Sequence, residues 1–247
     1  MELTGKLVLV TGASRGIGRS ISEKILDSGA RVIGTARVSE FPQELGSHPG
    51  FEGIKVDLAD MESIRERLKP VFRRERAPDV LVNNAGVFEP AGMESDEEAW
   101  LQNWNRTMEI NLRIPALLSR WALHRWKAEG DGVLINIASR AAYRGDTQEF
   151  ASYAASKGGM VAFTKSFARS FGRYGVAAYS IAPGFIDTDM ARESIEIYGE
   201  EYLTEGMAFD EITSPEQVAE MVQFLASGRV KHMTGATFHI NGGSYMI

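Results

Sequence analysis

The sequence predicts an α/β fold in which one parallel sheet is covered by helices on both faces. Three observations predict it. Short β-rich runs alternate with helical stretches, a glycine-rich turn follows the first run, and polar motifs follow several later runs. With 247 residues, 44% of them hydrophobic, the chain has ordinary globular composition. No repeat, low-complexity segment or linker divides it, so we expect residues 1–247 to form a single domain.

Seven apolar, β-rich runs are expected to form the strands. They are residues 7–10, 32–33, 54–56, 80–82, 133–137, 176–181 and 237–240. Between them, helical periodicity is found near residues 16–29, 60–76, 97–128, 152–172 and 215–226. Ser214 and Pro215 mark the start of the last helix, as N-cap and first helical residue. The alternation predicts a doubly wound sheet of about seven parallel strands.

The first strand leads into a glycine-rich turn, Thr11-Gly12-Ala13-Ser14-Arg15-Gly16-Ile17-Gly18. Glycines at a strand-to-helix turn let the backbone approach a ligand closely, and the helix start offers unpaired N–H groups and a positive dipole end. The spacing is Gly-x-x-x-Gly-x-Gly, which differs from the usual Gly-x-Gly-x-x-Gly dinucleotide fingerprint. We expect the turn to hold a pyrophosphate; the alternative is a merely flexible turn.

Tyr153 and Lys157 are four residues apart on a predicted helix. Four residues make just over one turn, so both side chains can point into the same cleft. A neighbouring Lys⁺ favours the phenolate, which makes a tyrosine hydroxyl usable as a general acid or base. Such a pair also occurs by chance on many helices, so its interpretation depends on the other motifs.

Motif residues follow four of the predicted strands at their carboxyl ends. They are Asp57, the segment 83–86 (Asn-Asn-Ala-Gly), Ser139 and the Pro183-Gly184 pair. In an open parallel sheet the ligand lies beyond these strand ends, so we expect the motifs to gather along one edge. Simpler structural roles are also open: Asp57 as a turn or cap residue, Asn83 as a link between strands, and Ser139 as a turn former.

Taken together, these motifs resemble the short-chain dehydrogenase/reductase family over nearly the whole chain. The resemblance rests on Thr11 to Gly18, Asp57, Asn83 to Gly86, Asn111, Ser139, Tyr153, Lys157, Pro183-Gly184 and Thr188. Within the family the chain is similar to bacterial 3-oxoacyl-[acyl-carrier-protein] reductases, through residues 183–190 and 240–243. The resemblance implies a Rossmann domain that binds a nicotinamide dinucleotide.

The resemblance also implies a catalytic set. Hydride would pass from the nicotinamide to a carbonyl carbon while Tyr153 gives a proton to the oxygen that Ser139 holds. Lys157 would lower the tyrosine pKa and hold the nicotinamide ribose, and Asn111 would anchor a water that links Lys157 to solvent. Asn111 could instead be a solvated helix residue. The 14 positions that separate Ser139 from Tyr153 are more than in close relatives, so the loop between them should differ in shape.

Cofactor binding is assigned by the same resemblance to residues from several strand ends. They are Gly12, Ser14, Arg15, Gly16, Ile17, Gly18, Arg37, Asp57, Leu58, Asn84, Ala85, Gly86, Tyr153, Lys157, Pro183, Gly184, Ile186 and Thr188. Asp57 would accept from the adenine amino group, and segment 84–86 would line the adenosine half. The second strand ends in Thr35-Ala36-Arg37 without an acid, and Arg15 lies in the glycine turn. We therefore expect NADP(H) rather than NAD(H), unless Arg37 is only a solvated loop charge.

A substrate lid is expected at residues 188–212, where family members carry one. The segment is rich in Glu and large apolar residues, which suits an apolar or mixed ketone. Reductases that serve acyl-carrier protein usually have basic residues near the end of the long helix, but acids interrupt them here in segment 127–131. The sequence therefore leaves acyl-carrier protein open as a partner, beside a small-molecule carbonyl or alcohol.

Composition argues against several other classes. No cysteine is present, and the four histidines lack ligand spacing, so we expect no metal site. A net charge of −6 disfavours nucleic-acid binding, and no segment approaches the length of about 20 apolar residues that spans a bilayer. Without a cationic leader, we expect a cytoplasmic protein. The family resemblance implies a homotetramer built through the helices near 97–128 and 152–172.

Three hypotheses follow. The leading one is an NADPH-dependent reductase that converts a ketone, which could be a 3-oxoacyl thioester, to a secondary alcohol. The second is an NAD-dependent alcohol or sugar dehydrogenase of the same family. The third is a non-catalytic, cofactor-binding regulator, which the intact set of Asn111, Ser139, Tyr153 and Lys157 disfavours.

Overall fold

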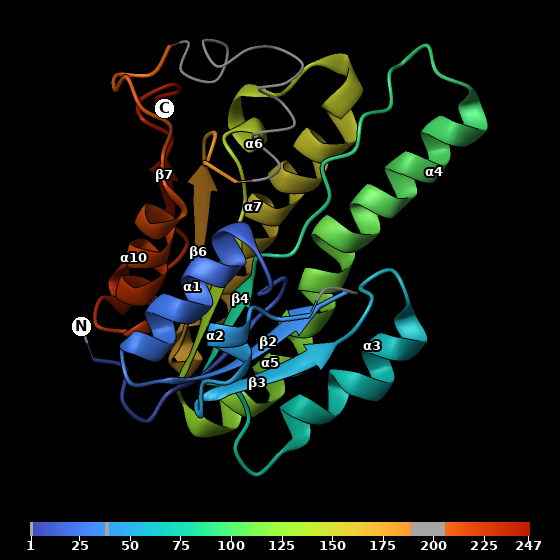
Figure 1. The fold of residues 1–247 in the computed structure, drawn as a ribbon. Helices are drawn as coiled ribbons and strands as arrows, with labels where there is room; N and C mark the ends of the chain where they lie inside the picture. Colours follow the sequence, from blue (N-terminus) through green and yellow to red (C-terminus); the bar gives the residue numbers. More distant parts are fainter. Residues whose placement is uncertain (1, 38–39, 189–205) are drawn as a thin grey trace.

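Seven parallel strands form one sheet in the computed structural model, which describes residues 2–37, 40–188 and 206–247 (Figure 1). They are β1 (Leu7–Val10), β2 (Arg31–Ala36), β3 (Phe51–Lys55), β4 (Val80–Asn83), β5 (Gly132–Ile137), β6 (Val176–Pro183) and β7 (Thr237–Ile240). Their order is β3-β2-β1-β4-β5-β6-β7, so the winding direction reverses between β1 and β4. All seven predicted strands and the doubly wound topology are confirmed.

Helices connect the strands and cover the sheet. The α-helices are α1 (Gly16–Asp27), α2 (Gln43–Gly46), α3 (Met61–Arg67), α4 (Glu97–Met108), α5 (Ile114–Glu129), α6 (Ala141–Arg144), α7 (Ala151–Phe171) and α10 (Pro215–Ala226). Short 3₁₀ turns lie at η1 (Lys69–Arg73), η3 (Gln148–Phe150), η4 (Gly172–Tyr174) and η5 (Lys231–Met233), and η2 (Glu109–Arg113) is a π-helix.

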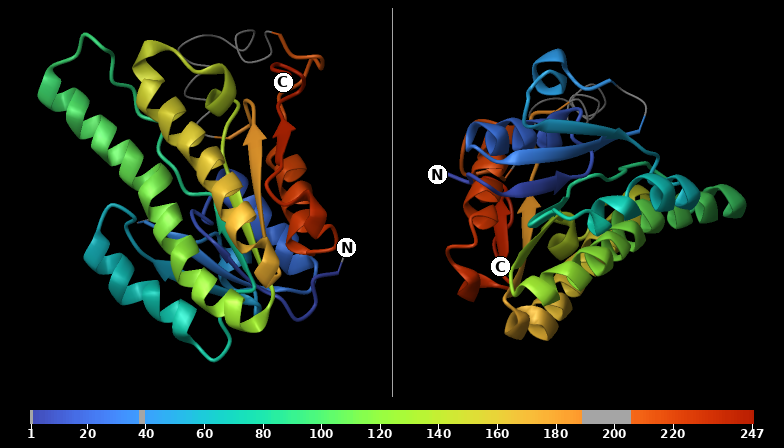
Figure 2. Two further views of the ribbon diagram at one scale, coloured as in Figure 1. Left: turned by 180° about the vertical axis from the view of Figure 1, so that it is seen from behind. Right: turned by 90° about the horizontal axis from the view of Figure 1, so that it is seen from below.

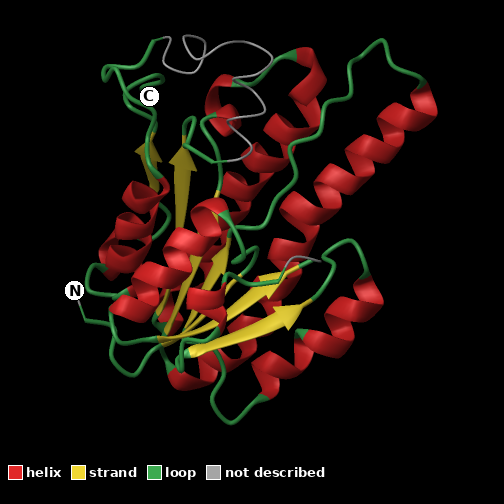
Figure 3. Cartoon of the chain, in the orientation of Figure 1, coloured by secondary structure: helices red, strands yellow, loops and turns green. Residues whose placement is uncertain are grey.

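Two hydrophobic cores lie on opposite faces of the sheet. Helices α1 and α10 pack side by side on one face, and α3, α5 and α7 cover the other (Figures 2 and 3). Strand β1 supplies both cores, because Val8 and Val10 point to the first and Leu7 and Leu9 to the second. A strand buried on both faces needs apolar residues throughout, which explains the uninterrupted apolar run in the sequence.

The helix predicted over residues 97–128 is interrupted. Helix α4 ends at Met108, five residues adopt the π-helix η2, and α5 begins at Ile114. Pro115 accounts for the break, because it has no N–H to donate to the carbonyl of Asn111 one turn earlier. The expectation of one continuous α-helix is therefore wrong, and the irregular turn contains Asn111 itself.

Other helix boundaries also shift. The predicted helix at 60–76 is α3 followed by the 3₁₀ turn η1, with Asp60 as the N-cap that accepts from the N–H groups of Glu62 and Ser63. Helix α10 starts as predicted with Ser214 at the N-cap and Pro215 in the first turn, but the Ser214 side chain makes no capping hydrogen bond.

Only the ends of the predicted lid at 188–212 can be placed, because residues 189–205 lie outside the described part of the chain. Its last part, residues 206–212, packs against the chain that follows β7. The N–H of Ala208 donates to the carbonyl of Gly242 at 2.6 Å. Residues 206–212 and the segment after β7 therefore meet beyond the carboxyl edge of the sheet.

Candidate active site

The glycine turn between β1 and α1 has the backbone geometry that its sequence predicts. Gly12 and Gly16 have φ angles of +69° and +51°, in the left-handed region that favours glycine. A side chain on Gly18 would overlap the carbonyl oxygen of Gly12. The backbone at Gly18 thus lies close to the backbone at Gly12, which leaves no room for a side chain at Gly18.

The start of α1 carries no side-chain cap. Arg15 occupies the N-cap position without a capping hydrogen bond from its side chain, and the first turn contains no acidic residue. The N–H groups of this turn and the positive end of the helix dipole therefore face the place where an anion would bind. The residues fit the pyrophosphate of a dinucleotide.

The loop after β4 is tied to the glycine turn. Thr11 Oγ1 accepts from the N–H groups of Asn84 and Ala85, both at 3.0 Å. Asn84 Nδ2 in turn donates to the carbonyls of Thr11 and Gly12, at 2.9 and 3.2 Å. Asn84 and Ala85 therefore lie directly beside the turn.

Ser139, Tyr153 and Lys157 lie together at the carboxyl end of β5. The Ser139 side chain lies close enough to the Tyr153 hydroxyl to lower its pKa. Lys157 is buried, with 3% of its surface exposed; its Nζ donates to the carbonyl of Ile137 at 2.7 Å and lies 5.7 Å from the centre of the Tyr153 ring. The prediction that the tyrosine and lysine share one side of a helix is confirmed.

The pKa values of this pair do not follow the sequence prediction. Burial raises the pKa of Tyr153 to about 12, the Ser139 side chain lowers it in part, and the nearby carboxylate of Asp146 raises it. Burial also lowers the pKa of Lys157 to about 8. In the protein alone the Tyr153 pKa is raised, mainly by loss of hydration, and the expected lowering by Lys157 is not among the causes of the shift.

Asn111 is buried, and its side chain makes three hydrogen bonds, two to the Val87 backbone and one to Ser156. Its Oδ1 accepts from the N–H of Val87 at 2.8 Å, while its Nδ2 donates to the Val87 carbonyl at 3.0 Å and to Ser156 Oγ at 3.1 Å. A Cβ on Gly86 would lie 3.1 Å from Asn111 Oδ1 and 3.5 Å from Lys157 Nζ. Asn111 therefore belongs to the same cluster and is not a solvated helix residue.

Two motif residues have the structural roles that the sequence left open. Asp57 Oδ1 accepts from the N–H of Ala59 at 2.8 Å, which closes a turn before α3. Asn83 Nδ2 donates to Asn136 Oδ1 at 2.8 Å and to Ser119 Oγ at 3.3 Å, which links β4 to β5 and α5. Leu58, beside Asp57, is buried.

The other candidate residues surround the same edge of the sheet. Arg37 directly follows β2 and is exposed, as is Arg15 in the glycine turn. The N–H of Gly184, after Pro183 at the end of β6, donates to the Ile240 carbonyl at 2.8 Å. Ile186 and Thr188 continue from there; a Cβ on Gly16 would lie 3.2 Å from Thr188 Cγ2. The predicted residues within the described chain are therefore gathered at one edge.

Sequence reasoning did not single out Phe88, Phe150 or Ser156. The Phe88 ring stacks on Phe150 and meets the Tyr153 ring at 4.8 Å with an interplanar angle of 81°. Ser156 Oγ donates to the Tyr153 carbonyl at 2.7 Å. Their positions, two residues after Gly86 and within four residues of Tyr153, are the signal by which they could have been found.

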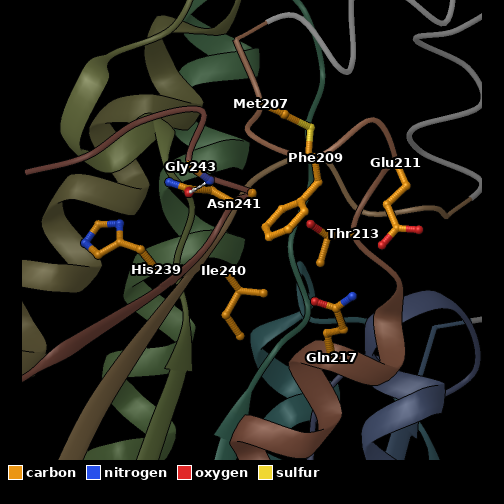
Figure 4. A pocket seen from close by; sticks show the side chains of 10 residues that line it. Met207, Phe209, Glu211, Thr213, Gln217, His239, Ile240, Asn241 and Gly243 are labelled. Carbon is orange, nitrogen blue, oxygen red and sulfur yellow. Dashed lines mark hydrogen bonds between the residues drawn. The ribbon is translucent and has the colours of Figure 1, made fainter.

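A separate pocket of about 360 Å³ lies at the end of β7 (Figure 4). Side chains from residues 207–217 and 239–243 line it, among them Phe209, Glu211 and His239. None of Asn111, Ser139, Tyr153 and Lys157 lines this pocket, so it is distinct from the cluster at β5. His239 packs edge-on against Tyr143 at 4.8 Å, and burial lowers its pKa, which suits a neutral strand residue.

The described residues, 2–37, 40–188 and 206–247, contain no group of three or more His, Cys, Asp or Glu side chains placed to hold a metal ion. No helix among them has both the length and the apolar character that crossing a bilayer requires.

Comparisons with known proteins agree with this geometry. Residues 6–198 match the model of the short chain dehydrogenase family. The chain is 37% identical over 249 residues to the 3-oxoacyl-[acyl-carrier-protein] reductase FabG of Vibrio cholerae, and 36% identical over 251 residues to that of Escherichia coli K12. Both alignments cover 100% of each chain.

Solved structures show the same fold. One is a protein from Beutenbergia cavernae assigned as an NAD(P)-dependent gluconate 5-dehydrogenase, with bound NADP at low occupancy. It superposes with a TM-score of 0.89 at 30% identity and covers 98% of each chain. Another, from Agrobacterium tumefaciens, is assigned as a 2-deoxy-D-gluconate 3-dehydrogenase with bound NADP (TM-score 0.87, 28% identity, 98% and 97% coverage). The chain therefore belongs to the short-chain dehydrogenase family of NAD(P)-dependent oxidoreductases.

Proposed function

We propose that this protein is an NADPH-dependent reductase that converts a ketone to a secondary alcohol, with a 3-oxoacyl thioester as one candidate substrate. The observation that carries the proposal is the closeness of three groups: Tyr153, the Ser139 side chain that influences its hydroxyl, and the buried Lys157, whose Nζ lies 5.7 Å from the centre of the Tyr153 ring. This arrangement supplies a proton donor, a second group for the carbonyl oxygen, and a cation in one place.

The cofactor would be held by the residues already placed at the sheet edge. The uncapped start of α1 suits the pyrophosphate, and segment 84–86 suits the adenosine half. NADPH supplies the hydride when bound. Lys157 Nζ would donate to the ribose hydroxyls next to the nicotinamide, for which its position beside Gly86 is suitable.

The protein itself would handle the proton. Tyr153 is protonated at neutral pH because burial raises its pKa to about 12, so its hydroxyl is ready to donate. Ser139 orients that hydroxyl and would hold the substrate oxygen. Each proton given up by Tyr153 must be replaced; Lys157, whose pKa burial lowers to about 8, is the nearby group able to supply one.

The choice of NADPH rests on charge at the end of β2. Arg37 is exposed there, Arg15 is exposed in the glycine turn, and segment 35–37 has no acid to bind a ribose 2′-hydroxyl. The solved structures with bound NADP, at 30% and 28% identity, support this choice. NAD(H) remains the less favoured cofactor.

Acyl-carrier protein and tetramer formation are parts of this proposal. The FabG relatives act on acyl-carrier-protein substrates, as their name states. In this chain, however, the basic residues near the end of α5 are engaged: Arg125 pairs with Glu129 at 2.5 Å, and Lys127 and Arg173 lie over the Tyr174 ring.

The exposed apolar residues Met246 and Ile247 support burial of the tail in an oligomer, for which we propose a homotetramer.

The test is a substrate panel with both reduced cofactors, followed by absorbance of the reduced nicotinamide. Acetoacetyl thioesters and simple ketones should be reduced faster with NADPH than with NADH. Tyr153→Phe should lower kcat by about 10²- to 10⁴-fold, because it removes the proton donor, while the Kd for NADPH changes little. Wild-type turnover in this variant would refute the mechanism.

A further inference from the structure

An aromatic pair lies beside Tyr153. Phe88 stacks face to face on Phe150, with ring centroids 3.8 Å apart and an interplanar angle of 3°. The Phe88 ring also contacts the Tyr153 ring at 4.8 Å. Phe88 comes from the loop after β4 and Phe150 from the turn before α7, so two distant segments meet next to the proton donor.

The backbone around both rings is fixed. The carbonyl of Glu89 accepts from Asn103 Nδ2 at 3.0 Å, and the Glu89 carboxylate pairs with Arg106 at 3.2 Å. The N–H of Ala91 donates to the Glu149 carbonyl at 2.8 Å, which joins the two loops directly. These bonds lie within three residues of Phe88 and next to Phe150, so the pair is held in place before any substrate binds.

The position of Phe88 places it on the substrate side. Going along the loop, Asn84 contacts the glycine turn, Gly86 approaches Lys157, and Phe88 reaches Tyr153. The cofactor path proposed above runs along the first two of these contacts. The third lies beyond it, where the groups attached to the reacting carbonyl must fit.

The charged groups around Tyr153 are one carboxylate and cations that have other partners. The Asp146 carboxylate lies close enough to raise the pKa of Tyr153. Lys157 Nζ, 5.7 Å from the centre of the Tyr153 ring, donates to the Ile137 carbonyl and is assigned to the nicotinamide ribose in the proposed function. Arg106 pairs with Glu89, next to Phe88, and Arg140 donates to Ser244 Oγ at 2.6 Å and packs over the Phe185 ring. A carboxylate on the substrate would meet an apolar wall and a like charge.

We propose that Phe88 and Phe150 form an aromatic wall that selects neutral ketones with an apolar substituent next to the carbonyl, and that disfavours polyhydroxylated keto acids. The proposal rests on the ketone reductase function proposed above and adds its substrate class. Apolar contact with a preformed aromatic surface stabilises such a substituent, whereas hydroxyl groups against it would lose hydrogen bonds to water. Sugar acids, the substrates named for the structurally similar dehydrogenases, are therefore expected to be poor substrates.

The experiment compares kcat/KM for ethyl benzoylacetate and for 5-keto-D-gluconate, with NADPH, in the wild type and in variants of both rings. The wild type should prefer the neutral ketone. Phe88→Ala and Phe150→Ala should each lower kcat/KM for it by about tenfold or more and leave the keto acid unchanged or improved, since a hydrophobic pocket discriminates by roughly this factor. Phe88→Leu keeps an apolar wall and should stay near the wild type. Phe163→Ala, which removes a half-buried ring further along α7, is the matched control and should not change the preference.

The outcomes separate this proposal from the function on which it rests. If no ketone is reduced with either cofactor, the proposed function fails. If ketones are reduced but the keto acid is preferred, or the Phe88 and Phe150 variants change both substrates by the same factor, the aromatic wall is refuted while the function stands. Thermal unfolding of each variant identifies any loss of kcat/KM that comes from misfolding. If an alanine variant does not fold, the comparison of Phe88→Leu with the wild type tests the proposal.

Discussion

Ser156 Oγ accepts a hydrogen bond from Asn111 Nδ2 at 3.1 Å, inside the protein and 45 residues apart in sequence. The same Ser156 hydroxyl donates a hydrogen bond to the carbonyl of Tyr153 at 2.7 Å. Asn111 is fixed at its other end by the N–H and carbonyl of Val87. One buried hydroxyl therefore connects the irregular turn η2 to the first turn of α7 that carries the tyrosine.

We predict that Ser156 is a positioning residue. Ser156→Ala should lower kcat by about two- to tenfold, the value of one buried hydrogen bond, with little change in the KM for NADPH. The pH profile of kcat should also shift, because the environment of Tyr153 and Lys157 changes. A purely structural serine would not move that profile.

Thr164 provides the matched control for Ser156. It is a fully buried hydroxyl two turns further along α7, bonded to Asn136 and to the Met160 carbonyl. Thr164→Ala should lower the free energy of unfolding to a similar degree but leave the pH profile of kcat unchanged. Equal profiles for the two variants would remove the positioning role from Ser156.

Gly86 gives a second test of the same cluster. A Cβ there would lie 3.1 Å from Asn111 Oδ1, closer than ordinary contact, and 3.5 Å from Lys157 Nζ. Gly86→Ala should therefore displace Asn111 and lower kcat/KM by roughly tenfold or more, since small misplacements near a reacting centre are costly. Gly92→Ala, whose Cβ would meet only Ser95 Oγ at 3.7 Å, should be near the wild type in the same assay.

Much of this arrangement could be predicted from sequence. The strands were predictable because both faces of the sheet are buried, which forces apolar runs such as Leu7–Val10. The shared edge followed from the rule that parallel strands end together. The π-helix at Glu109–Arg113 was not predicted, although Pro115 was visible in the sequence and marks the break.

Side-chain contacts and pKa values were beyond the reach of pattern reasoning. The stacking of Phe88 on Phe150 joins residues far apart in sequence, and neither position has a motif of its own. The Tyr153 pKa depends on how deeply the fold buries the hydroxyl, whereas the sequence shows only the charge four residues away. The spacing in the sequence therefore predicted that Tyr153 and Lys157 lie close together, but it did not predict their pKa values.

The buried lysine should give the protein a measurable alkaline stability change. Burial lowers the pKa of Lys157 to about 8, below the value near 10.4 expected in the unfolded chain. Between these values the unfolded state binds more protons, so stability rises with pH. Relative to Lys157→Met, the cofactor-free wild type should gain about 2 kcal/mol between pH 7.5 and 9.5. Denaturant unfolding at several pH values measures this difference, and a constant difference would mean that the lysine pKa is not lowered.

Cofactor choice can be tested at the end of β2. Arg37→Asp should weaken NADPH binding by about 10- to 100-fold, as expected for loss of a charge-assisted contact to a 2′-phosphate, and should leave NADH binding similar or stronger. Arg31→Asp is the matched control, because Arg31 is an exposed arginine at the opposite end of the same strand. Titration of both variants with each reduced cofactor gives the ratio of Kd values. Equal losses for NADPH and NADH would remove the assignment to NADPH.

Asp131 should contribute to stability at the opposite end of the sheet. Its carboxylate accepts from Lys6 at 3.0 Å and from Lys231 at 2.7 Å, which ties the start of β5 to both ends of the chain. Burial raises its pKa, but the hydrogen bonds to the two lysines outweigh that effect and hold the pKa below its ordinary value. A lowered carboxyl pKa stabilises the fold above the unfolded value near 3.9, and this contribution is lost as pH falls through the folded value.

Replacing Asp131 with Asn should therefore cost stability at neutral pH and nothing in strong acid. Because these side chains are 28–44% exposed, we expect a loss of only about 0.5–1 kcal/mol at pH 7. Glu129→Gln, which breaks an exposed i,i+4 pair with Arg125, should cost less than about 0.5 kcal/mol. Urea unfolding at pH 7 and pH 3 measures both effects. A loss that is the same at pH 3 as at pH 7 would show that Asp131 acts through packing, because the electrostatic contribution already shrinks once pH falls below the unfolded pKa near 3.9.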